Sequence, residues 1–105
     1  MKTRTRPTLE KIRRQRDVVL RIAAEHGASH VRIFGSVARG DSIQTSDIDI
    51  LVDMSPGLRG LEYFGALGDL QRALAAALGY GVDVIDSGAL HKRMKDRVLS
   101  EAVLL

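Results

Sequence analysis

The chain has 105 residues, 45% hydrophobic and 28% charged, which suffices for one hydrophobic core, so we expect a single domain over residues 1–105. It contains no cysteine, which excludes disulfides and thiolate metal sites, and its three histidines are too scattered to predict a zinc site. No apolar run reaches the roughly 20 residues that span a bilayer, and the N-terminus lacks the apolar segment of a signal peptide. We therefore expect a cytoplasmic protein with no membrane partner, in which any metal has oxygen ligands.

Basic residues crowd the first sixteen positions, where only Glu10 opposes them, and the net charge of the chain is +3. The basic residues are Lys2, Arg4, Arg6, Lys11, Arg13, Arg14 and Arg16. Such a patch can attract nucleic acid, but this one has no aromatic residue on which a base could stack. We interpret it as a solvated helix face and do not expect direct nucleic-acid binding.

Apolar residues at helical spacing predict one amphipathic helix from Thr8 to about His26, with Thr8 as its cap and Gly27 as its stop. A short strand is expected over Ser29–Phe34, because β-branched and aromatic residues gather there before a glycine. The small, polar stretch Ser36–Ser46 predicts a loop with room for one helical turn.

The second half of the chain predicts a strand, a long helix, a strand and a last helix. The strand Asp47–Met54 ends at a Ser-Pro-Gly turn, and the helix Leu58–Leu78 ends at Gly79. The third strand covers Val82–Ile85, and apolar residues from Leu90 onward predict a helix that reaches the C-terminus. Helices interleaved with strands indicate an α/β fold with a small sheet.

Asp47 and Asp49 are two residues apart on a predicted strand, so their side chains leave the same face of the sheet. The strand rise places their backbones about 6.6 Å apart, which allows both carboxylates to reach one magnesium ion. Asp53 lies on the same face of the strand by its spacing, but an aspartate at the end of a strand before a turn is common. We therefore expect a structural role for Asp53. An Asp-x-Asp pair alone is weak evidence for a site.

Gly35 and Ser36 follow the end of the preceding strand and can form a phosphate-binding site. A glycine lets a phosphate approach the backbone, and a serine hydroxyl and neighbouring amides can donate hydrogen bonds to it. Arg39 could add a cationic contact, and Gly40 permits the chain to reverse toward Asp47. Each of these residues is also compatible with a plain turn.

Asp83 is a third carboxylate, flanked by valines on the last predicted strand. Its charge must be paired, liganded or exposed, because burying it alone is costly. If its strand neighbours that of Asp47 and Asp49, three carboxylates meet at the point that a two-metal nucleotidyl transfer requires. Asp86 is three residues after Asp83, so on a strand its side chain points to the opposite face. We expect Asp86 to cap a helix.

The segments 34–40 (FGSVARG) and 46–52 (SDIDILV) together resemble the signature of minimal nucleotidyltransferase (MNT) domains, which belong to the DNA polymerase β-like superfamily. The resemblance implies a small mixed sheet flanked by helices, as in the polymerase β palm. It also implies that Gly35 and Ser36 bind the nucleotide triphosphate, and that Asp47 and Asp49 hold Mg²⁺, with Asp83 completing the triad.

Stand-alone domains of this kind resemble antitoxins that act on a HEPN-type ribonuclease toxin, in some pairs by transferring AMP from ATP to a tyrosine of the toxin. The short chain favours an acceptor carried by another protein, because it has no second lobe of its own. Two alternatives stay open: an antitoxin that acts by occlusion without turnover, and a transferase for a small molecule such as an aminoglycoside. The protein could accordingly form a hetero-oligomer or a homodimer.

Overall fold

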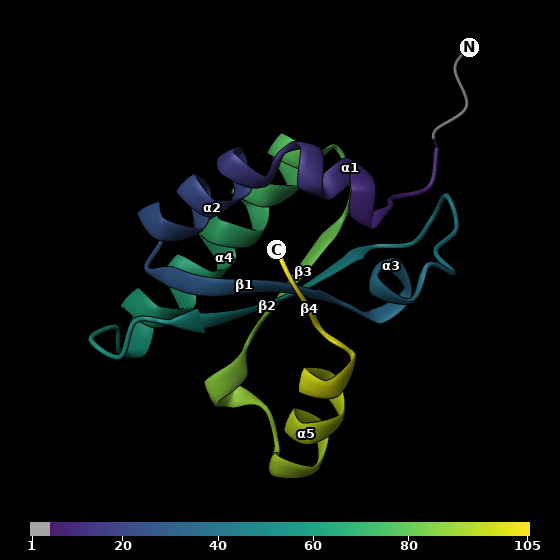
Figure 1. Cartoon of the computed structure of the whole chain (residues 1–105). Coiled ribbons are helices and arrows are strands. Elements are labelled where there is room, and N and C mark those ends of the chain that lie inside the picture. Colours follow the sequence, from purple (N-terminus) through teal and green to yellow (C-terminus); the bar gives the residue numbers. More distant parts are fainter. Residues whose placement is uncertain (1–4) are drawn as a thin grey trace.

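A four-stranded mixed sheet in the order β3-β2-β1-β4 forms the centre of the computed structural model, which describes residues 5–105 (Figure 1). Its strands are β1 (Ala28–Phe34), β2 (Ile48–Met54), β3 (Val82–Asp86) and β4 (Val103–Leu104). Strand β1 runs antiparallel to both β2 and β4, whereas β2 and β3 are parallel. The expected α/β fold with a small mixed sheet is confirmed.

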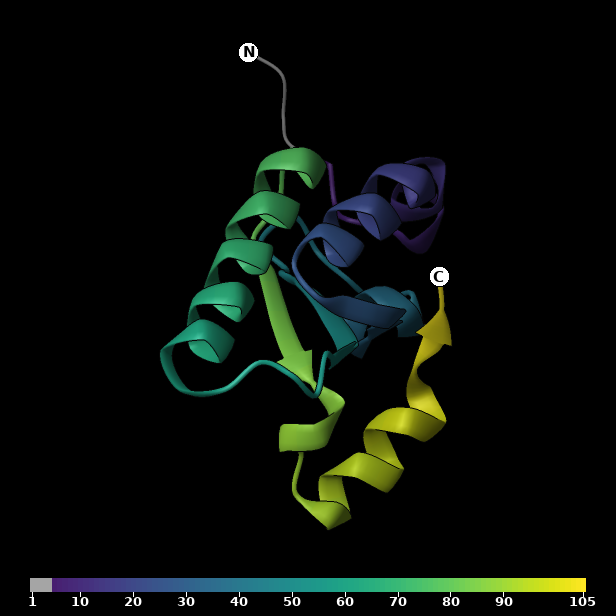
Figure 2. The same ribbon diagram turned by 90° about the vertical axis from the view of Figure 1, so that its left-hand side faces the viewer.

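The helices lie on both faces of this sheet. They are α1 (Leu9–Arg14), α2 (Arg16–Glu25), α3 (Gly35–Arg39), α4 (Gly60–Leu78), the 3₁₀ turn η1 (Ser87–Ala89) and α5 (Lys92–Glu101). Figure 2 shows α4 (green) to the left of the strands, α2 (purple-blue) above them and α5 (yellow) below them, while α3 follows directly on the end of β1. None of the described helices is long and apolar enough to cross a membrane.

Side-chain alternation divides the sheet into an apolar face and an acidic face. The apolar face carries Ile48, Ile50 and Val52 of β2, which are fully buried in one cluster with Leu70 and Leu74 of α4. Residues of opposite parity on β2 must point to the other face. The pattern that places isoleucines in the core therefore directs Asp49 away from it, and Asp47 follows the same parity just before the strand.

The first predicted helix is wrong in one respect, because the chain bends at Gln15 and forms two helices. The amide of Gln15 donates to the carbonyl of Ile12, a tight contact that interrupts the α-helical pattern. Ile12 and Val19 are both buried on either side of the bend. The sequence does not reveal this break, since no glycine or proline marks it. Thr8 does cap α1, with its hydroxyl 3.2 Å from the amide of Lys11.

The predicted last helix is also wrong at its end, because α5 stops at Glu101. Ala102 has an extended backbone, and Val103 and Leu104 then pair with Ile33 and Arg32 as strand β4. The same apolar residues that predicted a continuous helix also fit a chain that turns into the sheet. This turn buries Leu105.

Candidate active site

Strand β2 places the two central aspartates on the acidic face, at the end where β3 begins. The amide of Ile48 donates to the carbonyl of Gly81 at 2.8 Å, so residues 47–49 lie beside the start of β3. A Cβ atom on Gly81 would come within 2.2 Å of Oδ1 of Asp47. The Asp47 carboxylate therefore lies directly over the backbone of Gly81, in space that only glycine leaves open.

Asp83 stands next to Asp49 on the neighbouring strand. The parallel register of β2 and β3 pairs these two residues, and adjacent strands lie about 4.8 Å apart. Directly paired residues share a face of the sheet, so Asp83 joins the acidic face. From the sequence, Asp83 was expected to join the site only if its strand lay beside the strand of Asp47 and Asp49. The structure meets this condition.

Asp49 lies within electrostatic reach of the other two carboxylates. Burial raises the pKa of Asp49 above its ordinary value, and the negative charges of Asp83 and Asp47 raise it further. The positive charge of Arg39 opposes this shift. Three carboxylates thus share one small region, where a divalent cation would relieve their repulsion.

The donor atoms in this region suit a hard cation such as Mg²⁺, which prefers carboxylate oxygens. Across residues 5–105, however, no group of three or more His, Cys, Asp or Glu side chains is arranged so that it could hold a metal ion. The chemistry and charge of the aspartates therefore fit Mg²⁺, while their side chains are not drawn together around a common point.

Gly35 joins β1 to α3 and lies against Asp49. Its φ of +70° is a left-handed conformation that favours glycine, and a Cβ there would approach Oδ2 of Asp49 to 2.2 Å. Ser36 follows as the second residue of α3, and Gly40 caps this helix with a φ of +84°. The predicted helical turn and the chain reversal at Gly40 are both confirmed, and Gly35-Ser36 lies beside the aspartates.

Arg39, the last residue of α3, is within electrostatic reach of Asp49 but also has partners of its own. Its Nε lies 3.4 Å from Oδ2 of Asp41, and its Nη1 lies 3.8 Å from Oε2 of Glu101 on α5. Arg39 could be identified from the sequence, whereas Glu101 could not, because the apolar spacing of the last helix does not indicate which end of the sheet that helix faces.

A pocket of about 240 Å³ opens beside these residues, between α3 and α5. It is lined by Phe34, Gly35, Arg39, Met94, Arg97, Val98 and Glu101. Phe34 pairs with Asp49 in the sheet register, so the pocket adjoins the acidic face. Helix α5 therefore contributes to the surroundings of the site, which the sequence alone did not predict.

Asp53 has the structural role expected of it. Its carboxylate lies 2.7 Å from Nη2 of Arg32 and 3.0 Å from Nδ1 of His30, and it accepts a hydrogen bond from the hydroxyl of Ser87. Burial raises the pKa of Asp53, but the hydrogen bonds from Ser87 and Arg32 and the charges of Arg32 and His30 outweigh it, so the pKa is lowered overall. Asp53 holds β1, β2 and η1 together.

Asp86 is a cap, as its parity suggested. It accepts a hydrogen bond from the amide of Gly88 at 3.2 Å at the start of η1, and another from the hydroxyl of Tyr63 at 2.7 Å. Burial and the hydrogen bond to this carboxylate raise the pKa of Tyr63 to about 12. Asp86 thus joins α4 to the end of β3 and does not belong to the acidic triad.

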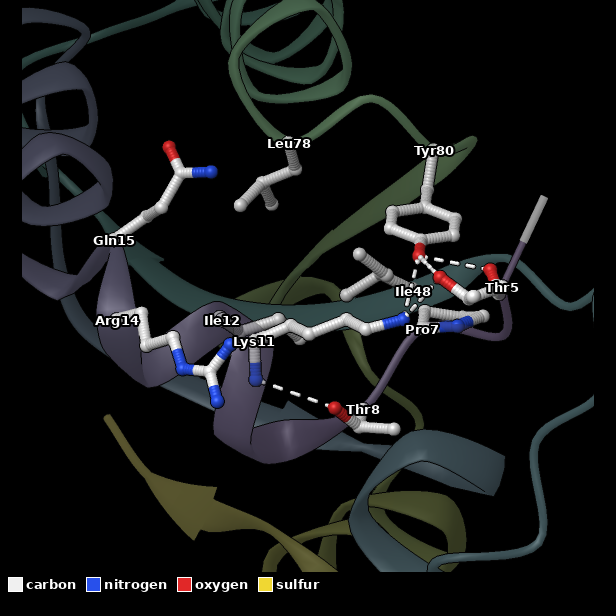
Figure 3. Close-up of a pocket in the computed structure, with 10 residues that line it drawn as sticks. All are labelled: Thr5, Pro7, Thr8, Lys11, Ile12, Arg14, Gln15, Ile48, Leu78 and Tyr80. Carbon is white, nitrogen blue, oxygen red and sulfur yellow. Dashed lines mark hydrogen bonds between the residues drawn. The ribbon is translucent and has the colours of Figure 1, made fainter. Parts of the chain in front are cut away.

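A second pocket, of about 300 Å³, lies on the opposite side of the sheet (Figure 3). Ile48 lines it, and its side chain points away from Asp47 and Asp49 by parity. Lys11 reaches across this pocket to the hydroxyl of Tyr80 at 3.2 Å. The pocket therefore lies on the face of the sheet that the aspartates do not occupy.

The basic N-terminal region is engaged in local contacts where it is described. Arg14 pairs with Glu10 at 2.7 Å on the exposed surface of α1, and Arg6 donates to the carbonyl of Gly40 at 3.2 Å. Lys2 and Arg4 lie outside the described residues. These contacts agree with a solvated helix face.

Comparison with known proteins identifies the family. The model described as "Polymerase beta, Nucleotidyltransferase" matches residues 14–105, so the chain belongs to this family of nucleotidyltransferases. The "Putative protein adenylyltransferase MJ0435" of Methanocaldococcus jannaschii is 41% identical over 85 residues, which are 81% of this chain and 87% of that protein. The solved "Structure of putative minimal nucleotidyltransferase" is 40% identical, has a TM-score of 0.79, and covers 94% of this chain and 97% of its own.

Two toxin–antitoxin complexes share the fold at lower identity. A crystal structure of a toxin-antitoxin with AMP-PNP is 23% identical with a TM-score of 0.69, over 84% of this chain and 69% of its own. A tri-AMPylated Shewanella oneidensis HEPN toxin in complex with MNT antitoxin is 20% identical with a TM-score of 0.62, over 90% of this chain and 70% of its own. The resemblance to minimal nucleotidyltransferases is confirmed.

Proposed function

We propose that this nucleotidyltransferase is an antitoxin that transfers AMP from ATP to a tyrosine hydroxyl of a partner HEPN-type ribonuclease toxin, with Mg²⁺ as its cofactor. The observation that carries the proposal is the pairing of Asp49 with Asp83 across β2 and β3, with Asp47 on the same face and Gly35 packed against Asp49. A protein that only bound its partner would have no need for three carboxylates on one face beside a glycine that a phosphate can approach.

The roles follow from position. Asp47, Asp49 and Asp83 would hold Mg²⁺, which neutralises charge on the triphosphate and lowers the barrier to deprotonating the attacking hydroxyl. Gly35 and Ser36 would receive the triphosphate, since the glycine leaves the backbone open beside Asp49. Asp83 is exposed, which would let it accept a proton from an acceptor that arrives from solvent.

The reaction balances as a displacement at the α-phosphorus. The tyrosine oxygen forms a bond to that phosphorus, the bond from phosphorus to the bridging oxygen of the β-phosphate breaks, and pyrophosphate leaves. The hydroxyl proton passes to a carboxylate of the acidic face. The product is a tyrosine that carries AMP.

The acceptor would come from another protein. Asp47 and Asp83 are both exposed, so this side of the site is open to a partner. The relative in Methanocaldococcus jannaschii is named for transfer to protein, and the neighbour of Shewanella oneidensis pairs an MNT antitoxin with an AMPylated HEPN toxin. The first supports a protein acceptor and the second a toxin as that protein, while the structure with AMP-PNP supports an ATP-like donor.

The test is transfer of label from α-labelled ATP, with Mg²⁺, to the toxin encoded beside this chain. The wild type should label the toxin, and the double variant Asp47→Asn with Asp49→Asn should not. Asp17→Asn is the matched control, because Asp17 is exposed on α2 and remote from the acidic face. Toxin neutralised equally by the double variant, with no label transferred by either, would favour occlusion. Label on a small molecule such as an aminoglycoside, without the toxin, would replace the proposed acceptor.

A further inference from the structure

Glu101, near the end of α5, shares its carboxylate between two arginines from different helices. Oε2 lies 3.8 Å from Nη1 of Arg39 on α3, and Oε1 lies 4.0 Å from Nε of Arg97 one turn earlier on α5. Both distances are at the long end for an ion pair, and the Arg97 side chain is 84% exposed. Exposed pairs of this kind are weak and easily exchanged.

These three residues border the pocket of about 240 Å³ beside Gly35. Phe34, Met94 and Val98 form its apolar part, and of the described residues that line it, Arg39 and Arg97 are the cations. Phe34 pairs with Asp49 in the sheet register and Gly35 lies against the Asp49 side chain, so the pocket adjoins the acidic face.

A polyphosphate that approaches three carboxylates is repelled unless cations stand nearby. Arginine is suited to this task, because its planar guanidinium binds phosphate oxygens through two parallel hydrogen bonds. A phosphate chain with several negative charges competes well against a single carboxylate at about 4 Å, which makes Glu101 a replaceable partner.

We propose that Arg97 and Arg39 form a polyphosphate-binding subsite in this pocket, and that Glu101 occupies both guanidiniums until the phosphates of the nucleotide displace it. This inference rests on the proposed function, since it assigns the position of the donor's phosphates. It adds α5 to the nucleotide site and gives Glu101 the role of an internal competitor that limits affinity for the nucleotide.

The inference predicts opposite effects on binding from two residues that are four apart on one helix. Arg97→Gln should weaken binding about fivefold, because one phosphate contact is lost, and Glu101→Gln should tighten it about threefold, because both guanidiniums are released. Arg97→Lys keeps the positive charge but loses the guanidinium that can form two parallel hydrogen bonds. Its affinity should therefore lie between those of the wild type and Arg97→Gln. Arg93→Gln is the matched control, since Arg93 is an exposed arginine of α5 that does not line the pocket.

The experiment is isothermal titration of the full chain with Mg²⁺–AMP-PNP and, separately, with inorganic tripolyphosphate and with adenosine. The proposal expects both phosphate compounds to bind with the stated order of affinities, and adenosine to bind without dependence on Arg97. Unchanged affinity for AMP-PNP and tripolyphosphate in both Arg97→Gln and Glu101→Gln would overturn it, as would binding of adenosine that is lost in Arg97→Gln.

The readout separates this inference from the proposed function, because binding requires neither acceptor nor turnover. If Arg97→Gln binds normally while the wild type still labels the toxin, the subsite is wrong and the function stands. If the variants bind the nucleotide in the predicted order of affinities and no toxin is labelled, the subsite is supported and the proposed acceptor is wrong.

Discussion

Asp49 of β2 pairs in register with Asp83 of β3, so two carboxylates stand side by side on parallel strands. Like charges on directly paired residues destabilise a sheet, and a fold retains such an arrangement where function requires it. The pKa of Asp49 is accordingly raised, by burial first and then by Asp83 and Asp47.

The pH dependence of stability should report this repulsion. A pKa of Asp49 above its ordinary value means that its charged form is less favourable in the folded chain than in the unfolded chain. The folded protein therefore loses stability as the pH rises from the ordinary value through the raised pKa, and the loss persists at neutral pH.

Asp49→Asn should consequently be more stable than the wild type at pH 7.5 without divalent cations, by about a few tenths of a kcal/mol, since the carboxylate is only partly buried. The difference should shrink at pH 4. Urea denaturation at the two pH values measures it, and an Asp49→Asn variant that is less stable than wild type at pH 7.5 would contradict the account.

Mg²⁺ should raise the unfolding temperature of the wild type, because a ligand that binds the folded state stabilises it. The double variant Asp47→Asn with Asp49→Asn should lose this response, whereas Asp17→Asn should keep it. Thermal unfolding with and without EDTA is the measurement, and an equal Mg²⁺ response in the double variant would place the ion elsewhere.

Gly35→Ala should damage both stability and nucleotide binding. Its Cβ would meet Oδ2 of Asp49 at 2.2 Å, and alanine resists the φ of +70° at a cost of about 1 to 2 kcal/mol. Thermal unfolding and titration with AMP-PNP measure the two effects. Gly57→Ala is the control, because its Cβ would have only Ser55 Oγ nearby, at 3.9 Å. Normal AMP-PNP binding by Gly35→Ala would show that the glycine does not shape the site.

Gly81→Ala should separate activity from stability. A Cβ on Gly81 would come within 2.2 Å of Oδ1 of Asp47, a side chain that can rotate away. We expect transfer to fall about tenfold or more while the free energy of unfolding changes by less than about 1 kcal/mol. Gly65→Ala, in open space on α4, should instead stabilise the protein by about 0.5 to 1 kcal/mol. Undiminished transfer by Gly81→Ala would contradict the placement of Asp47.

Tyr63→Phe should lower the free energy of unfolding by about 1 kcal/mol, because it removes the 2.7 Å hydrogen bond to Asp86. It should leave transfer to the toxin unchanged, since Asp86 is a cap outside the triad. Chemical denaturation and a transfer assay test both statements, and a large loss of transfer at unchanged stability would bring Asp86 into the catalytic machinery.

The sequence predicted the acidic face well because strand alternation is a strong constraint. Because Ile48 and Ile50 point into the core, the side chain of Asp49 must point to the other face of the sheet. Asp47 points to the same face as Asp49. The position of Asp83 required tertiary information, since parity alone does not say which strand is its neighbour. Gly35 was predicted from the sequence to bind phosphate together with Ser36, but its contact with Asp49 became visible only in three dimensions.

The elements that sequence reasoning missed depend on packing between distant segments. The bend at Gln15 carries no glycine or proline, and the turn of Val103 and Leu104 into β4 satisfies the same apolar spacing as a helix. The approach of Glu101 to Arg39 follows from that turn, because β4 returns the chain to β1 and holds α5 near α3. No local pattern contains this information.

The most direct test of the central claim is mass spectrometry of the partner toxin after incubation with this protein, ATP and Mg²⁺. The account predicts a mass increase of one or more AMP groups, located on tyrosine, with the wild type and with Asp17→Asn. It predicts no increase with the double variant Asp47→Asn and Asp49→Asn. An increase of equal size with the double variant, or a toxin that stays unmodified while the wild type binds ATP and the toxin, would contradict it.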